Sequence, residues 1–430
     1  MTVVLFYGRP CPEEESQAAN VTPSVLIIST SPSFSPARLS MAMAKCGFNI
    51  VAICPARHIL RRIPAVKKLF SYHSLMPLRS VSNAIRASNP DLVIPCDDWS
   101  ASLLHQLYLA SERRPEGGGK ISSLIERSLG SPENFHIAYD RAHFLELARN
   151  ERLRVPESRA ISCSEDFGKW TKDVGFPAVL KANSTSGGEG VRIVSNLEEA
   201  ERTLLLLQKP PMIAKALKRV LIDQDMALLW PSLLRLTYTV NIQAFVRGRD
   251  ATSAVACWNG KVLASLHFEV VHKQDKTGPS TVLRLIENKD MSAAAERMAR
   301  RLGLSGLHGF DFVLEGTTEN AYLIEINPRA TQVGHMALGE GRDLPAALFA
   351  ALTGASDQVR QKATDKDMIA LFPQEWLRNP ASEYLRSAYH DVPWEEPEYI
   401  FACLEKRKNQ LGRSPLQKWI QALSKKARET

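Results

Sequence analysis

Short apolar runs alternate with amphipathic stretches over the first third of the chain. Residues 25–29, 49–54 and 91–95 are nearly unbroken apolar runs, which are typical of strands covered on both faces. Between them, apolar residues recur at helical spacing over 33–46 and 81–87. Strands that alternate with helices predict a parallel sheet with helices on both faces.

This first part of the chain, residues 23–135, is predicted to form a Rossmann-like α/β domain. The turn after its first strand reads Ser-Thr-Ser-Pro-Ser over 29–33 and lacks the G-x-G-x-x-G pattern of dinucleotide sites. We therefore do not expect dinucleotide binding there. Residues 1–22, which precede the first strand, are interpreted as a flexible lead-in.

The pattern changes beyond residue 155, where several strands follow one another with few helices between them. The predicted strands are 176–182, 191–194, 240–246, 251–258, 261–271, 309–314 and 321–326. The predicted helices are 197–208, 291–302 and 344–352. This order indicates an α+β region with antiparallel strands.

Length and charge add two constraints. At 430 residues the chain exceeds the size at which one hydrophobic core keeps growing, so two or three domains are expected. Most of the net charge of +8 comes from residues 401–430, which contain eight Lys or Arg residues and only two Glu residues. Because the remainder is nearly neutral, the charge does not favour nucleic-acid binding and indicates a basic tail.

The basic tail has two interpretations. Residues 415–427 place Leu416, Trp419, Ile420 and Leu423 at helical spacing. Such a helix could lie on an anionic membrane surface or a partner, or it could dock on the protein with its lysines in solvent. We favour the docked helix.

The cysteines and the apolar stretches indicate a cytoplasmic protein. The seven cysteines are scattered, odd in number and without a C-x-x-C pair, so neither a disulfide framework nor a zinc site is expected. The first residues do not resemble a signal peptide, and no apolar stretch reaches the roughly 20 residues of a membrane helix.

The strongest chemical signal is a pair of strands that carry alternating polar residues. Gly309–Glu315 contains Asp311, and Leu323–Arg329 contains Glu325, Asn327 and Arg329. If the strands pair, the two carboxylates and the amide oxygen converge as hard ligands suited to Mg²⁺ on substrate phosphates. Arg329 would lie beside charge that develops on a transferring phosphoryl group. The alternative is a hairpin with an exposed polar face, which explains the set less well.

Two weaker signals precede it. Lys181 lies on a strand that leads into the glycine-rich loop 184–190, where backbone N–H groups could approach phosphates, although no Walker pattern ends the loop. The segment 241–252 is an apolar strand that enters a Gly turn and then an acidic residue. Taken alone, either signal is equally well explained by an ordinary hairpin.

The order and separation of these motifs resemble the ATP-grasp superfamily over residues 25–350. The motif sequences are similar to those of carboxylate–amine ligases, among them D-alanine–D-alanine ligases and the synthetase halves of carbamoyl-phosphate synthetase. The resemblance implies a two-lobe ATP-grasp domain over 136–355, with lobes at about 155–245 and 246–355. Residues 356–430 would form a C-terminal helical extension that ends in the basic tail.

The resemblance also implies roles for individual residues. Arg141, where the family usually has Lys, is a predicted nucleotide contact. The predicted phosphate contacts are Lys181, Ser184, Ser186, Gly187, Gly188 and Gly190. Gln243 would face the adenine amino group, the backbone of Ala244, Phe245 and Val246 would bind the adenine edge, and Asp250 would bind the ribose. Asp311, Glu325 and Asn327 would hold Mg²⁺, with Mn²⁺ as an alternative. Arg329 would act on the transferred phosphate. The insertion 209–236 has no counterpart that we can place.

A loop of basic residues offers further candidates. Lys273 and Lys276 could reach the γ-phosphate or a substrate carboxylate, and Arg284 could pair with a substrate carboxylate. The alternative is a solvated loop. Lys273 and Arg284, with Arg329, are the predicted catalytic residues.

The function implied by the resemblance is ATP-dependent activation of a small-molecule carboxylate as an acyl phosphate and its coupling to an amine. One alternative is a carboxylase-like enzyme that activates bicarbonate, disfavoured because no biotinyl-type Met-Lys-Met segment is present. Another is a non-catalytic ATP-binding regulator. A homodimer is the expected assembly if the chain oligomerises.

Overall fold

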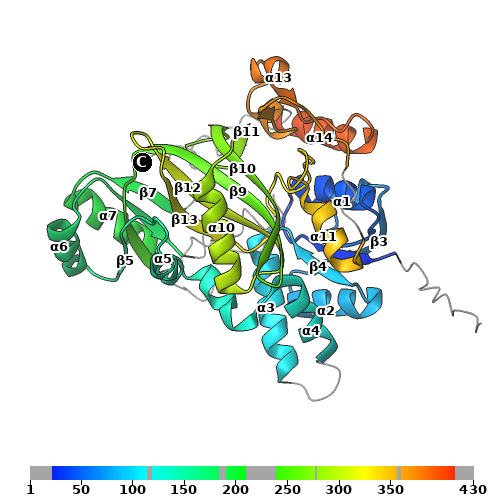
Figure 1. Cartoon of the computed structure of the whole chain (residues 1–430), viewed down its shortest axis with the longest axis horizontal. Helices are drawn as coiled ribbons and strands as arrows, with labels where there is room; N and C mark the ends of the chain where they lie inside the picture. The colour runs from blue at the N-terminus through cyan, green and yellow to red at the C-terminus, as the bar shows by residue number, and fades with distance from the viewer. Residues whose placement is uncertain are drawn as a thin grey trace, which may run out of the picture.

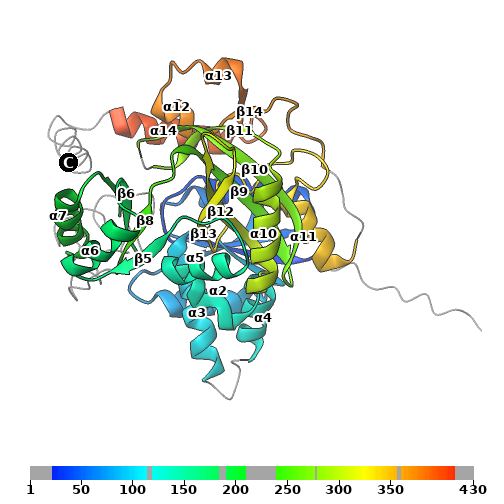
Figure 2. The ribbon, with the colours of Figure 1, turned by 60° about the vertical axis from the view of Figure 1, so that its left-hand side comes forward.

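The computed structural model describes residues 22–113, 119–183, 190–209, 239–276, 278–355 and 360–411. These residues form three sheets, which are spread across the view in Figure 1; in the turned view of Figure 2 the N-terminal sheet lies behind the large sheet. Several sequence predictions lie outside the described residues: most of the lead-in 1–22, Ser184, Ser186, Gly187 and Gly188, nearly all of the insertion 209–236, and the tail from 412 onward with its helix 415–427.

The N-terminal sheet is parallel, as the sequence predicts, with the order β3-β2-β1-β4. Its strands are β1 (Ser24–Ile28), β2 (Asn49–Cys54), β3 (Val66–Ser71) and β4 (Leu92–Pro95). Its helices are α1 (Ser35–Lys45), α2 (Pro77–Ser88), α3 (Asp98–Glu112) and α4 (Gly119–Leu129), and a 3₁₀ segment η1 spans Ile59–Arg62. The sequence analysis missed β3, because Lys67 and Lys68 interrupt the apolar run that a central strand would show; lysines are typical of an edge strand.

A small antiparallel sheet follows, with the order β5-β8-β6-β7. It consists of β5 (Ser158–Ile161), β6 (Ala178–Ala182), β7 (Val191–Val194) and β8 (Val240–Ala244), with α6 (Ser164–Asp173) and α7 (Leu197–Gln208) packed on it. The segments η2 (Pro132–Tyr139) and α5 (Arg141–Asn150) connect it to the N-terminal sheet.

The large sheet has seven strands in the order β13-β12-β9-β10-β11-β14-β15. Five of them are β9 (Gly248–Trp258), β10 (Lys261–Lys273), β11 (Ser280–Leu285), β12 (Gly306–Glu315) and β13 (Ala321–Asn327), all antiparallel. Its helices are α10 (Lys289–Leu302), which covers one face in Figure 1, and α11 (Leu344–Thr353).

The segment predicted as a C-terminal extension contributes to this large sheet. It supplies β14 (Met368–Ala370), which pairs with β11, and β15 (Tyr389–His390), which pairs with β14. It also forms α12 (Gln374–Arg378), α13 (Tyr384–Ser387) and α14 (Pro397–Leu411). The strands are only three and two residues long, too short to give a periodicity that can be recognised in the sequence.

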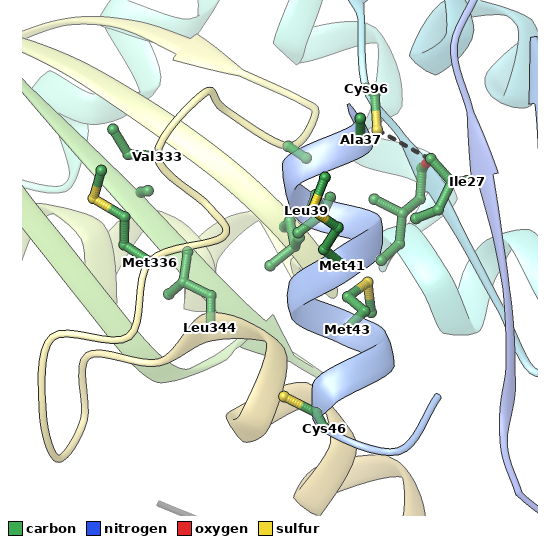
Figure 3. Close-up of a cluster of buried hydrophobic side chains, with 14 of the residues drawn as sticks. Ile27, Ala37, Leu39, Met41, Met43, Cys46, Cys96, Val333, Met336 and Leu344 are labelled. Atoms are coloured by element: carbon green, nitrogen blue, oxygen red, sulfur yellow. Dashed lines mark hydrogen bonds between the residues drawn. The ribbon is translucent and has the colours of Figure 1, made fainter. Parts of the chain in front are cut away.

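One hydrophobic core joins the N-terminal sheet to the large sheet. Leu39 and Met43 of α1 are buried in the same cluster as Val333 and Leu344, which follow β13 (Figure 3). The aromatic rings of Phe48 and Phe349 complete the contact edge to face, with centroids 5.1 Å apart. The two sheets are thus parts of one packed body. In the described residues, no helix is long and apolar enough to span a membrane.

We expect Leu39→Ala to destabilise both sheets together. Leu39 is 2% exposed, so the change should lower the free energy of unfolding by about 2–5 kcal/mol in one cooperative denaturant transition. The matched control is Leu109→Ala on α3, where the side chain is 58% exposed and the expected change is within about 0.5 kcal/mol. Two separate transitions in the wild-type chain would contradict a shared core.

Candidate active site

The pairing of β12 with β13 brings three predicted metal ligands together. Asp311 lies opposite Glu325, and Gly309 lies opposite Asn327. The Asn327 side-chain N–H donates to Asp311 Oδ2 at 2.9 Å. The convergence predicted for these three side chains is therefore present in the structure.

Asp311 is held from two sides. Thr252 of β9 lies opposite Asp311, and its hydroxyl donates to Asp311 Oδ1 at 2.8 Å. Burial raises the pKa of Asp311, and the neighbouring Glu325 carboxylate raises it further. The Thr252 and Asn327 hydrogen bonds oppose this by favouring the charged form. A cation at this position would relieve the repulsion between the two carboxylates.

Basic side chains of the small sheet and α5 face these carboxylates. Arg141, the first residue of α5, donates to Glu325 Oε1 at 2.8 Å and to the Ala182 carbonyl at 2.6 Å. Lys181 of β6 is only 6% exposed. Burial lowers the pKa of Lys181 to about 8, and Glu325 partly opposes this shift by favouring the charged ammonium.

Arg329 connects this group to the N-terminal sheet. Its Nε–H donates to Asp98 Oδ1 at 2.7 Å, where Asp98 is the first residue of α3. A weaker contact of 3.3 Å joins its Nη2 to Asn327 Oδ1. The site thus contains side chains that are supported by all three sheets.

The predicted adenine segment lies at the connection between the small and large sheets. β8 ends at Ala244 and β9 begins at Gly248. A pocket of about 470 Å³ opens there, and its wall includes Ala244, Phe245 and Val246. The Ala244 N–H already donates to the Glu157 carbonyl at 2.8 Å. Gln243 is 5% exposed and does not line this pocket.

Two predicted residues pair with each other. Lys273, at the end of β10, forms an ion pair with Asp250, so the predicted catalytic lysine contacts the predicted ribose-binding acid. Asp250 lies two residues before Thr252 on β9 and shares its face. Both residues therefore belong to the side of the sheet that carries Asp311.

Arg284 is a correction to the sequence analysis, because the structure does not bring it to this group. Arg284 lies opposite Glu269, Glu269 lies opposite Ala251, and Ala251 lies opposite Phe312, so all share one face of the large sheet. Asp311 adjoins Phe312 in the strand and lies on the other face. Arg284 instead contacts Glu269, with its Nη1 3.8 Å from Oε2.

The segment that carries most of these residues matches a known family. Residues 140–340 match the carbamoyl-phosphate synthase L chain, ATP binding domain. The arginine-specific large chain of carbamoyl phosphate synthase from Halalkalibacterium halodurans is 24% identical over 269 residues, which cover 62% of this chain and 24% of that protein. The chain spans about a quarter of the length of the curated relatives it matches.

Two solved structures share the fold. One is the biotin carboxylase domain of 2-oxoglutarate carboxylase from Hydrogenobacter thermophilus, in complex with MgADP, ADP and bicarbonate. Its TM-score is 0.55 at 15% identity, over 79% of this chain and 71% of that chain. The other is N5-carboxyaminoimidazole ribonucleotide synthetase in complex with ADP, with a TM-score of 0.55 at 15% identity over 79% of each chain.

The chain is similar to ATP-grasp proteins. The resemblance expected from the motif order is confirmed. The predicted ATP-grasp motifs at Lys181, Asp311 and 325–329 all fall within the matched segment.

Sequence reasoning missed two residues that contact this group of side chains. Thr252 could have been found, because it lies two residues beyond Asp250 and shares its face in a strand. Asp98 could not, because its partner Arg329 is 231 positions away and no local pattern links them.

We expect the stability of the chain to depend on pH through Lys181. The native lysine loses its proton above about pH 8, whereas the unfolded lysine keeps it to about pH 10.5, so the unfolded state binds more protons between these values. Between about pH 7.5 and pH 10, the free energy of unfolding of wild type should therefore rise by about 2 kcal/mol relative to that of the Lys181→Met variant. Denaturant titrations at both pH values would measure it.

The matched control is Lys261→Met, which changes an exposed lysine at the start of β10. Its stability difference from wild type should be the same at both pH values. If the Lys181→Met difference is equally independent of pH, Lys181 does not carry the lowered pKa.

Proposed function

We propose that the chain is an ATP-dependent ligase that phosphorylates a substrate carboxylate and couples the resulting acyl phosphate to an amine. The observation that carries this proposal is the convergence of Asp311, Glu325 and Asn327 with Lys181 and Arg329. Three hard oxygen ligands beside one buried and one half-buried cation form an arrangement suited to a polyphosphate and its metal ion, since both charges are then compensated.

The ligand chemistry fits Mg²⁺. Asp311, Glu325 and Asn327 would hold the ion, and when bound it would neutralise the β- and γ-phosphate oxygens. Within the described ranges, no group of three or more His, Cys, Asp or Glu side chains could form a metal cage. An ion at Asp311 and Glu325 would take further ligands from water and phosphates, as Mg²⁺ usually does.

Other residues of the site would bind the nucleotide and stabilise the transferring phosphoryl group. Lys181 and Arg141, together with the loop that ends at Gly190, would bind the nucleotide phosphates from the small sheet. The segment 243–246 would bind adenine, and Asp250 the ribose. Arg329 would stabilise charge on the transferring phosphoryl group, because a guanidinium offers several donors in a fixed plane.

The reaction proceeds in two steps. A carboxylate oxygen attacks the γ-phosphorus, the bond to the bridging oxygen breaks, and ADP leaves. The amine nitrogen then attacks the acyl carbon, phosphate leaves with the former carboxylate oxygen, and the nitrogen releases a proton. Exclusion of water during the reaction would protect the acyl phosphate from hydrolysis.

A second candidate is bicarbonate as the activated carboxylate. One specific observation favours it: the biotin carboxylase domain that shares the fold was solved with bicarbonate and MgADP. The two candidates differ only in the first substrate, so one assay separates them.

We expect phosphate release from MgATP to require a carboxylate, and stable product to require an amine. The measurement is a screen of amino acids and small carboxylates, singly and in pairs, with ADP and phosphate as readouts. A substrate labelled with ¹⁸O in its carboxylate should transfer one label to phosphate, and labelled bicarbonate tests the second candidate. Tight nucleotide binding with no ADP under any pair would contradict the ligase proposal.

We expect Asp311→Asn and Glu325→Gln to lower kcat about 100-fold or more, because the charge that holds the metal on the transferring phosphate is lost. Both should also raise the Mg²⁺ concentration needed for half-maximal rate. The control is Glu296→Gln, an exposed residue of α10 on the other face of the large sheet. A Glu325→Gln variant with the Mg²⁺ dependence of wild type would remove Glu325 from the metal site.

A further inference from the structure

Arg329 is anchored by the first residue of α3, the helix that follows β4 of the N-terminal sheet. The Asp98 carboxylate accepts from the Arg329 Nε–H at 2.7 Å, across 231 positions of sequence. The Asp98 side chain is 40% exposed and that of Arg329 is 24% exposed. We propose that Asp98 is a positioning residue that holds Arg329 for phosphoryl transfer. This inference rests on the proposed function and assigns a part of that reaction to the N-terminal sheet.

Hydrogen bonds of the neighbouring Asp97 hold the turn that carries Asp98. The preceding Asp97 caps α3 by accepting from the Ser100 N–H at 2.8 Å. Asp97 also accepts from the Thr30 N–H at 2.6 Å and from the Thr30 hydroxyl at 2.7 Å. Because Thr30 follows β1 and Asp97 follows β4, these bonds tie two adjacent strand ends together. These bonds hold the backbone from which the Asp98 side chain extends toward Arg329.

The backbone beside Arg329 is fixed to the same turn. The Ala330 N–H donates to the Pro95 carbonyl, at the end of β4, at 3.0 Å. A side-chain bond at Arg329 and a main-chain bond at Ala330 therefore attach the end of β13 to the end of β4. Two contacts from adjacent residues restrict both the place and the rotation of the guanidinium, which is the requirement for a group that must meet a transferring phosphate.

Asp98 also opposes a competing contact. Among the described residues, the other side-chain hydrogen bond of Arg329 is the 3.3 Å contact with Asn327, and the negative charge of Asp311 lies close enough to act on the guanidinium. Without the charge of Asp98, the guanidinium would be drawn toward Asp311, which belongs to the proposed metal site. Asp98 thus keeps Arg329 directed away from a ligand that the metal needs.

The test uses Asp98→Asn, which keeps the shape and removes the charge. We expect kcat for ADP formation to fall about 10- to 100-fold while the KM for ATP changes less than about threefold, because Arg329 acts mainly in the transition state. Asp98→Glu should restore part of kcat. A purely structural loss would lower the amount of folded enzyme, which is measured separately by denaturation.

The matched control is Asp290→Asn. Asp290 also lies in the first turn of a helix, is 41% exposed, and pairs with Arg154 at 2.6 Å, but its helix α10 packs on the face of the large sheet opposite Asp311. It should keep wild-type kcat and KM. If Asp98→Asn behaves like Asp290→Asn, the positioning role is wrong.

A readout that does not need turnover separates this inference from the proposed function. The Nε–H resonance of Arg329, assigned by its loss in Arg329→Lys, should shift in Asp98→Asn and stay unchanged in Asp290→Asn. A wild-type chain that forms no ADP with any substrate would overturn the proposed function. An unchanged Arg329 resonance in Asp98→Asn would overturn the placement of Arg329 by Asp98.

Discussion

The register between β12 and β13 is the constraint on which the candidate site depends. Side chains in a strand alternate between faces, so a slip of one residue would move Asp311 into the core. The other face prevents such a slip, since Phe310 and Phe312 are buried against α10. The same two strands thus secure the hydrophobic core on one side and the carboxylates on the other.

A bulge reconciles these two demands. The register shifts between Asp311 and Phe312, so that Glu325 lies opposite Asp311 while Leu323 lies opposite Phe312. With strict alternation, Leu323 and Glu325 would share a face. The extra residue, Ile324, lets Leu323 enter the core and Glu325 face Asp311. The motif depends on this irregularity as much as on the identities of its residues.

Local patterns predicted the parts of the fold that local forces determine. The apolar runs of β1, β2 and β4 were sufficient to predict a parallel sheet, and the polar alternation near Asp311 was sufficient to predict that these polar side chains converge. Arg284 was misplaced, because a basic residue beyond a turn gives no indication of its face until the register of β10 and β11 is known. β14 and β15 join a sheet whose other strands lie far earlier in the sequence. Their pairing therefore depends on long-range contacts that a short stretch of sequence does not reveal.

The core shared by α1, the segment after β13 and α11 limits how this architecture can be recombined (Figure 3). An N-terminal unit with its own closed core could be replaced by another without repacking. Here the apolar side of α1 is complementary to Val333, Met336 and Leu344, so a replacement must match that surface as well as its own sheet. A change of substrate specificity therefore requires less repacking when it occurs in the turns at the strand ends than when the whole N-terminal unit is exchanged.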